Sequence, residues 1–139
     1  MIISRATADH LGELLPLTEE FYAIDGHDWD AGLVTAALGP LLADDTYGFV
    51  LIAEGAYAVV CYSYSLESGG RDACLDEIYV RDRSRGLGAA LLRAALDRAR
   101  DGGARRMFLE TEAHNTRVRG FYGRHGFEVD DSIWMSRPL

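Results

Sequence analysis

The sequence predicts a mixed α/β fold in which helices cover one central sheet. Segments with the two-residue apolar period of strands alternate along the 139 residues with segments of helical period. Apolar residues make up 48% of the chain and charged residues 26%, which are values typical of globular proteins. The length suits one domain with a real core, so we expect residues 1–139 to form a single domain.

The first part of the chain is expected to be mainly helical. Ile2 and Ile3 begin a short strand, and apolar residues at helical spacing over 11–22 predict an amphipathic helix that ends near Gly26. A second helix is predicted over 33–42, bent or broken at Gly39 and Pro40. An acidic, aromatic turn separates the two helices.

The middle of the chain is expected to form strands. Residues 47–53 and 56–66 are rich in β-branched and aromatic side chains, and a tight turn at Glu54 and Gly55 joins them into a predicted hairpin. A glycine-containing loop then leads into a strand over 73–80.

Helices and strands alternate in the remaining third. A helix that begins with glycines at 86 and 88 is expected to stop at Gly102 and Gly103. The remaining segments are a strand over 106–111, a helix over 115–124 ended by Gly126, and short final strands over 127–129 and 132–135.

Charge is distributed unevenly along the chain. Residues 1–80 carry a net charge of −12 and residues 81–139 a net charge of +4, which together give the total of −8. This polarity suggests an anionic ligand on the C-terminal half and a cationic ligand near the N-terminal half. The acidic half lacks the basic surface that nucleic-acid binding requires, so we expect no nucleic-acid partner.

Several other features limit the class of protein. The apolar run at the N-terminus is too short for a signal peptide, and no run is long enough to span a bilayer, so we expect a cytoplasmic protein with no membrane partner. Cys61 and Cys74 lie in predicted strands and are expected to be buried free thiols. The spacing of His27, His114 and His125 fits no metal site, so we predict no metal.

The most informative stretch is a strand, an arginine-rich turn and a glycine-led helix over 75–100. The first amides of a helix have no intrahelical partner, and the helix dipole places positive charge there, so this position suits an anion. Gly86 and Gly88 allow a large phosphate to approach, and Arg83 and Arg85 add positive charge. The stretch therefore predicts an anion cradle.

Two common nucleotide-binding motifs fit this cradle poorly. The sequence contains no lysine, which excludes the P-loop of nucleotide hydrolases. A dinucleotide fingerprint requires a third glycine where Leu91 stands. The fingerprint should also follow its strand directly, whereas five residues separate Val80 from Gly86.

The motif Arg85-x-x-Gly88-x-Ala90 after Ile78-Tyr79-Val80 instead resembles the acetyl-coenzyme A motif of the GCN5-related N-acetyltransferases, the GNAT superfamily. Further along, Leu109-Glu110-Thr111 with Asn115, Phe121-Tyr122 and Gly126-Phe127 resembles the second half of that signature. The resemblance implies a mixed, mostly antiparallel sheet of six to seven strands flanked by about four helices. It also implies acetyl-CoA as cosubstrate, and a homodimer, because members of the family often form dimers.

The resemblance also implies which residues bind acetyl-CoA. The turn is expected to hold the pyrophosphate and the strand edge the pantetheine arm, and Asn115 and Tyr122 belong to the same site. The expected cofactor-binding residues are Ile78, Tyr79, Val80, Arg85, Gly86, Leu87, Gly88, Ala89, Ala90, Asn115 and Tyr122.

The reaction requires an acid and a base. Tyr122 matches the tyrosine that protonates the departing thiolate in the family, and the reference pKa of tyrosine lies above that of a thiol. A carboxylate must accept the proton of the attacking amine. Asp76 and Glu77 point to opposite faces of their strand, so at most one of them can face the cleft. Glu110 matches a position that acts as the base in some members of the family. Glu77 and Glu110 rank above Asp76 for this role.

The acceptor is expected to be a small cationic amine. The hairpin and the strand at 75–80 resemble the branch that contains diamine and polyamine acetyltransferases. Carboxylates would attract a cation, and aromatic rings would contact it through cation–π interactions. The expected substrate-binding residues are Glu20, Tyr22, Asp28, Trp29, Tyr64 and Asp76.

The predicted function is therefore the transfer of acetyl from acetyl-CoA to a diamine, a polyamine or a basic amino acid by direct attack in a ternary complex. Two alternatives stay open at this point. One is a protein N-terminal or lysine acetyltransferase, which the Leu-Glu-x-x-x-x-Asn pattern at 109–115 favours. The other is a non-catalytic module that binds coenzyme A.

Overall fold

The computed structural model describes residues 2–139. The chain divides into two compact units, Met1–Leu109 and Glu110–Leu139, and each unit is described by itself. The first unit holds a five-stranded sheet in the order β1-β2-β3-β4-β5. Its strands are β1 (Ser4–Arg5), β2 (Gly48–Ala53), β3 (Ala56–Ser65), β4 (Gly70–Val80) and β5 (Met107–Phe108).

Neighbouring strands in this sheet run antiparallel, except for β4 and β5, which run parallel. The hairpin of β2 and β3 turns at Glu54 and Gly55, as the sequence predicts. The sheet has fewer strands than the expected six to seven, although the mixed α/β fold class is confirmed.

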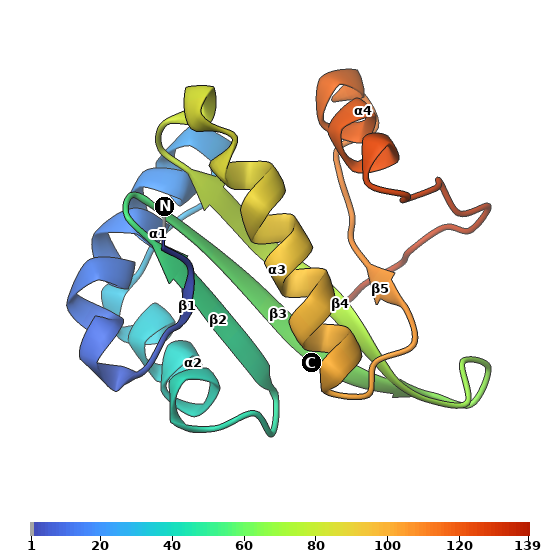
Figure 1. Ribbon diagram of the computed structural model, residues 1–139, viewed down its shortest axis with the longest axis horizontal. Coiled ribbons are helices and arrows are strands. Elements are labelled where there is room, and N and C mark those ends of the chain that lie inside the picture. Colours follow the sequence, from blue (N-terminus) through green and yellow to red (C-terminus); the bar gives the residue numbers. More distant parts are fainter. Residues whose placement is uncertain (1) are drawn as a thin grey trace. The chain divides into compact units, whose positions relative to one another are not determined.

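Three α-helices cover the two faces of this sheet (Figure 1): α1 (Leu11–Asp25) and α2 (Ala31–Ala43) lie on one face, and α3 (Leu87–Asp101) lies on the other. A short 3-10 helix, η1 (Ala8–His10), precedes α1. Apolar side chains of α1 and α2, among them Leu14 and Leu38, pack against Val50, Tyr57 and Val59 in one buried cluster. The second unit contains α4 (Thr116–Arg124).

Several element boundaries differ from those predicted. The first strand is Ser4–Arg5 rather than residues 2–3, because these residues pair with Leu51 and Ile52. Helix α2 continues through Pro40 without a break, since Leu41 and Leu42 after the proline are buried and hold the last turn against the core.

The predicted strand at 106–111 is reduced to two residues. Met107 and Phe108 pair with Ala73 and Cys74 of β4, and the pairing ends there. Two residues further on, β4 carries a bulge at Asp76, where Val59 pairs with Glu77 but Val60 pairs with Leu75. A bulge bends and twists its strand locally, and the pairing of β4 with β5 ends two residues before it.

The expected final strands at 127–129 and 132–135 are absent from residues 110–139, all of which the structure describes. The alternating apolar side chains of that segment are largely exposed. Val129 is 83% exposed, Ile133 91% and Met135 90%. Alternation alone does not make a strand, because a strand also requires a partner edge for its backbone hydrogen bonds.

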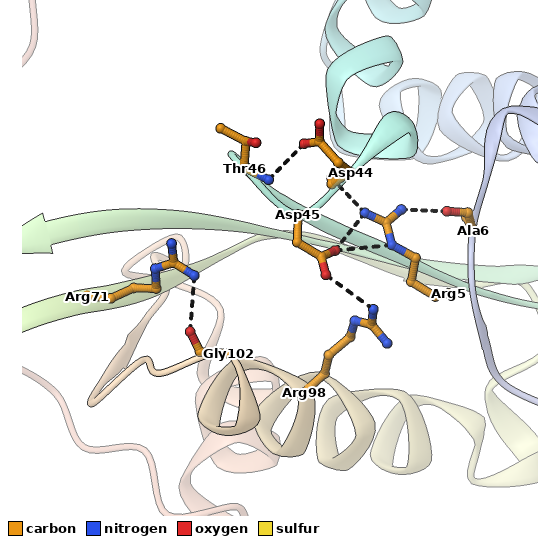
Figure 2. A network of polar contacts seen from close by, with 8 residues as sticks. All are labelled: Arg5, Ala6, Asp44, Asp45, Thr46, Arg71, Arg98 and Gly102. Carbon is orange, nitrogen blue, oxygen red and sulfur yellow. Dashed lines mark hydrogen bonds and ion pairs between the residues drawn. The ribbon is translucent and has the colours of Figure 1, made fainter.

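Arginines fasten α3 to the sheet (Figure 2). Arg5 donates to the Asp45 carboxylate at 2.8 Å and to the carbonyl oxygens of Ala6 and Asp44 at 2.6 and 2.8 Å. Arg98 of α3 lies 3.5 Å from the other oxygen of Asp45, so this carboxylate joins β1 to α3. At the same C-terminal end of α3, Arg71 donates to the carbonyl of Gly102, the C-cap residue, at 3.0 Å.

Candidate active site

The predicted anion cradle lies where β4 leads into α3. After β4 the chain forms the short 3-10 helix η2 (Arg83–Arg85), and the Asp82 carboxylate accepts hydrogen bonds from the Ser84 amide at 3.0 Å and the Ser84 hydroxyl at 2.6 Å. Gly86 then adopts a left-handed conformation with φ of 69° and forms the N-cap of α3. The amides of the first turn of α3 therefore point out of the helix end without intrahelical partners.

A cavity of about 320 Å³ adjoins this helix end, lined by Ile2, Ala53, Glu54, Arg85 and Leu87. Arg81 and Asp82 line a smaller neighbouring hollow. Backbone amides, the helix dipole and the guanidinium of Arg85 form a donor set that fits a diphosphate. The residues from Arg85 to Ala90 that were expected to bind the cofactor are all located at this turn.

Beside the cradle, β4 offers an open backbone edge. Ile78, Tyr79 and Val80 pair with Ala58, Tyr57 and Ala56 of β3 on one side. On the other side, β5 pairs only at Ala73 and Cys74, so within residues 2–109 no strand occupies the edge at 78–80. Free backbone groups on a strand edge suit an extended ligand that contains amides.

Glu77 lies next to this edge and accepts two hydrogen bonds from tyrosines. The Tyr22 hydroxyl of α1 donates to Oε2 at 2.5 Å, and the Tyr57 hydroxyl of β3 donates to Oε1 at 2.7 Å. The register of β3 and β4 places Tyr57, Glu77 and Tyr79 on the face that α1 covers. The structure thus brings predicted residues Tyr22 and Glu77 together.

The environment of Glu77 favours a carboxylate with a raised pKa. Burial is the largest cause of the rise in the pKa of Glu77, and the neighbouring charge of Asp76 acts in the same direction. The two tyrosine hydrogen bonds and His27 oppose the rise. Burial and the Glu77 charge also raise the pKa of Tyr22 and of Tyr57, so both phenols remain protonated donors.

Glu20, which was expected to contact the substrate, is engaged elsewhere. Its carboxylate accepts hydrogen bonds from Arg81 at 2.6 and 2.9 Å and from the Tyr79 hydroxyl at 3.2 Å. The hydrogen bond from Arg81 is the largest cause of the lowered pKa of Glu20. Glu20 thus ties α1 to the end of β4.

The other residues expected at the acceptor site are scattered. The Trp29 indole donates to the Thr18 hydroxyl at 3.0 Å and the ring packs against the core, whereas Asp28 is exposed. Alternation along β3 places Tyr64 on the face opposite Glu77, where it is 80% exposed. Asp76 is exposed on the bulge beside Glu77.

The unit 110–139 holds three further predicted site residues. Asn115 caps α4, because its side-chain oxygen accepts a hydrogen bond from the Val118 amide at 3.2 Å. Tyr122 is buried between Phe121 and Phe127, with ring centroids 5.2 and 5.6 Å away, and burial raises its pKa. Glu110 is exposed. The roles of these three residues at the cofactor stay predictions.

Sequence reasoning missed Tyr57. This residue is fully buried, yet its hydroxyl reaches Glu77. Its position in a strand was predicted, but which residue of β4 it faces depends on the register and on the bulge at Asp76. The alternation of residues in a strand does not show where a bulge adds an extra residue. The pairing of Tyr57 with Glu77 therefore could not be predicted from the sequence.

The described residues 2–139 contain no group of three or more His, Cys, Asp or Glu side chains placed to hold a metal ion. None of the helices in that range combines the length and the apolar character needed to cross a bilayer. Cys61 and Cys74 are not joined in a disulfide, and both are half-buried on directly opposed positions of β3 and β4.

Comparison with known sequences identifies related proteins. The profile of the Acetyltransferase (GNAT) family matches residues 13–127. The uncharacterized N-acetyltransferase YhfO of Bacillus subtilis is 37% identical over 70 residues, which are 49% of this chain and 47% of that protein. An uncharacterized N-acetyltransferase of Mycobacterium bovis is 31% identical over 103 residues, 73% of this chain and 65% of that protein. The chain thus spans about half to two thirds of these relatives.

Solved structures share the fold over nearly the whole chain. An integron cassette protein from a salt-marsh metagenome superimposes with a TM-score of 0.87 at 29% identity, covering 99% of this chain and 90% of that one. An acetyltransferase candidate from Arthrobacter sp. FB24 has a TM-score of 0.87 at 26% identity, covering 100% and 96%. A ribosomal-protein-alanine N-acetyltransferase from Brucella melitensis, at 21% identity with a TM-score of 0.75 and 99% coverage of both chains, shares the fold alone.

Proposed function

Because this chain belongs to the GNAT family of acetyltransferases, we propose that it transfers the acetyl group of acetyl-CoA to a primary amine of a small cationic molecule. The observation that carries the proposal is the position of Glu77, a half-buried carboxylate that two tyrosines hold beside an open strand edge and an anion cradle. All three features lie within residues 2–109.

The cradle and the strand edge suit the two parts of the cosubstrate. The first-turn amides of α3 and the Arg85 guanidinium complement the two negative charges of a pyrophosphate. The free backbone edge at Ile78 to Val80 complements the amides of the pantetheine arm. The thioester at the end of that arm would then lie near the bulge that precedes Glu77.

Glu77 is the best-supported proton acceptor among the three carboxylates considered. In the proposed step, the ammonium form of the acceptor gives one proton to Glu77, and the neutral nitrogen forms a bond to the thioester carbonyl carbon. The carbon–sulfur bond then breaks, coenzyme A leaves as a thiolate, and the nitrogen loses its second proton as the amide forms. That second proton balances the one that the thiolate takes up to become the free thiol. A raised pKa makes Glu77 a stronger base than an ordinary carboxylate. Asp76 and Glu110 are exposed, where water would compete for them.

Tyr122 remains the proposed donor of the proton to the departing thiolate. Its burial keeps the phenol protonated, since burial raises the pKa of Tyr122. This role rests on the family resemblance and on the retained tyrosine.

The acidic loop near Glu77 supports a cationic acceptor. His27 lies 6.3 Å, centroid to centroid, from the Tyr22 ring, so the end of α1 at Asp25 and the following acidic loop with Asp28 adjoin the Glu77 cluster. Residues 1–80 carry a net charge of −12. Such a field attracts a diamine, a polyamine or a basic amino acid and raises its local concentration. Glu20 contributes less to this field, because Arg81 neutralises it.

The test is a panel of amines assayed by release of free coenzyme A. We expect turnover with at least one diamine, polyamine or basic amino acid, and slower turnover with neutral amines of the same length. Acetylation of peptide N-termini or lysines alone would favour the protein acetyltransferase instead. Tight binding of acetyl-CoA without turnover of any acceptor would favour a non-catalytic module. Light scattering on the same sample would test the homodimer that we propose from the resemblance.

A further inference from the structure

We propose that Tyr57 and Tyr22 are positioning residues that hold the Glu77 carboxylate in a single orientation toward the acceptor amine. The inference rests on the proposed role of Glu77 as proton acceptor. It assigns a function to Tyr57, which the sequence did not single out, and gives Tyr22 a role other than direct contact with the substrate.

The first argument is geometric. Tyr57 donates to one oxygen of the Glu77 carboxylate and Tyr22 donates to the other, so rotation of the carboxylate would break both hydrogen bonds. A carboxylate oxygen has two acceptor sites, which leaves one site on each oxygen for an incoming proton. Charge-assisted hydrogen bonds of this kind are short and strong, which fits the distances of 2.7 and 2.5 Å.

The second argument is the rigidity of the support. The Tyr57 ring is fully buried, and Phe21 packs edge-on against it with centroids 6.4 Å apart. Phe21 also stacks on Tyr79 at 5.6 Å and contacts the Tyr22 ring at 6.0 Å. The aromatic cluster therefore fixes the hydroxyls on α1 and β3 relative to β4, and a displacement of about 1 Å in a catalytic group can slow a reaction ~100-fold.

The third argument is electrostatic. Burial and Asp76 raise the pKa of Glu77, whereas the hydrogen bonds from the two phenols lower it and so favour the ionised form of the carboxylate. Other titratable groups surround Glu77 from every neighbouring element. These groups are Tyr22 on α1, His27 on the following loop, Tyr57 and Cys61 on β3, and Asp76 on β4. Of these groups, Tyr22 and Tyr57 donate hydrogen bonds to Glu77, one to each carboxylate oxygen.

The experiment removes each hydroxyl and leaves its ring in place. In Y57F, Y22F and the double variant, the pKa of Glu77 is measured by carbon-13 NMR of the labelled carboxylate, with E77Q used to assign the signal. We expect each single variant to raise the pKa of Glu77 by about one unit and the double variant to raise it further. The matched control is Y62F, which removes a hydroxyl from the opposite face of β3 and should leave the Glu77 titration unmoved.

Kinetics separate positioning from folding. We expect kcat to fall about tenfold in Y57F with no change in KM for acetyl-CoA, and the acidic limb of the pH–rate profile to move upward together with the pKa of Glu77. Folded Y57F and Y22F with an unmoved Glu77 titration would overturn the inference. If the wild type acetylates no amine, the proposed function fails, and the NMR titration still decides whether the tyrosines hold the carboxylate.

Discussion

At the scale of single residues, the site depends on one carboxylate in a partly apolar setting. Leaving water destabilises the ionised form of Glu77, and two phenol donors offset part of that effect. The same balance would make Glu77 a stronger base in its proposed role as proton acceptor. It also makes Glu77 a group that weakens the fold when it is ionised.

This balance predicts how stability depends on pH. The folded-state pKa of Glu77 lies above its ordinary value, so its contribution to stability is fully present below the unfolded-state pKa and is lost as the pH rises through the folded-state pKa. Each unit of pKa elevation corresponds to about 1.4 kcal/mol. We therefore expect the free energy of unfolding of the wild type, relative to that of E77Q, to fall as the pH rises above the ordinary pKa of a glutamate, about 4.3.

Urea unfolding of both proteins across this pH range measures the effect. The comparison with E77Q cancels the contributions of Glu20, Asp44 and Asp82, whose lowered pKa values act in the opposite direction. A difference between the wild type and E77Q that is constant with pH would show that Glu77 is not buried as described.

At the scale of secondary-structure elements, the N-cap residue of α3 must adopt the left-handed backbone conformation. Gly86 has a φ of +69°, and a Cβ at this position would meet no atom within 4 Å, so only the backbone conformation disfavours a side chain. The cradle therefore depends on a turn that glycine adopts readily and alanine does not.

We expect G86A to lower the free energy of unfolding by about 1 kcal/mol, and to weaken acetyl-CoA binding because the first-turn amides shift. The control is G39A, in the middle of α2, where a Cβ also meets nothing within 4 Å and φ is not positive. G39A should raise stability by up to about 1 kcal/mol. Thermal unfolding and calorimetric titration with acetyl-CoA measure both effects, and equal behaviour of the two variants would contradict the described turn.

The elements that could be predicted from the sequence are those with local signals. The hairpin turn at Glu54–Gly55, the end of α1 at Gly26 and the start of α3 each follow from nearby residues. The bulge at Asp76 and the short β5 depend on pairing between distant segments, which periodicity does not encode.

At the scale of the whole chain, the parts of the site also differ in whether they depend on neighbouring residues or on pairing between distant segments. The anion cradle is contiguous in sequence, and its residues were found from their spacing. The cluster around Glu77 draws on α1, β3 and β4, so its members come together only when the sheet register is known. Long-range pairing can also remove a residue from a predicted site. Glu20 was expected at the acceptor site from the acidic composition of its segment, but it binds Arg81, which lies 61 positions away in the sequence.

Opposite charge in the two halves of the sequence fits a protein that holds an anionic cosubstrate and a cationic acceptor. The cradle belongs to the start of the basic half, and Glu77 with the acidic loop belongs to the acidic half. Both lie within the unit Met1–Leu109, on either side of the end of β4.

The most direct test of the central claim is acetyl transfer by E77Q to the best amine of the panel, measured with saturating acetyl-CoA beside the wild type and E67Q. Glu67 is an exposed residue of the turn between β3 and β4 and serves as the matched control. We predict that E77Q lowers kcat by about 100-fold or more. Both E77Q and E67Q should bind acetyl-CoA with the wild-type affinity. Wild-type kcat in folded E77Q would contradict the assignment of Glu77 as the proton acceptor.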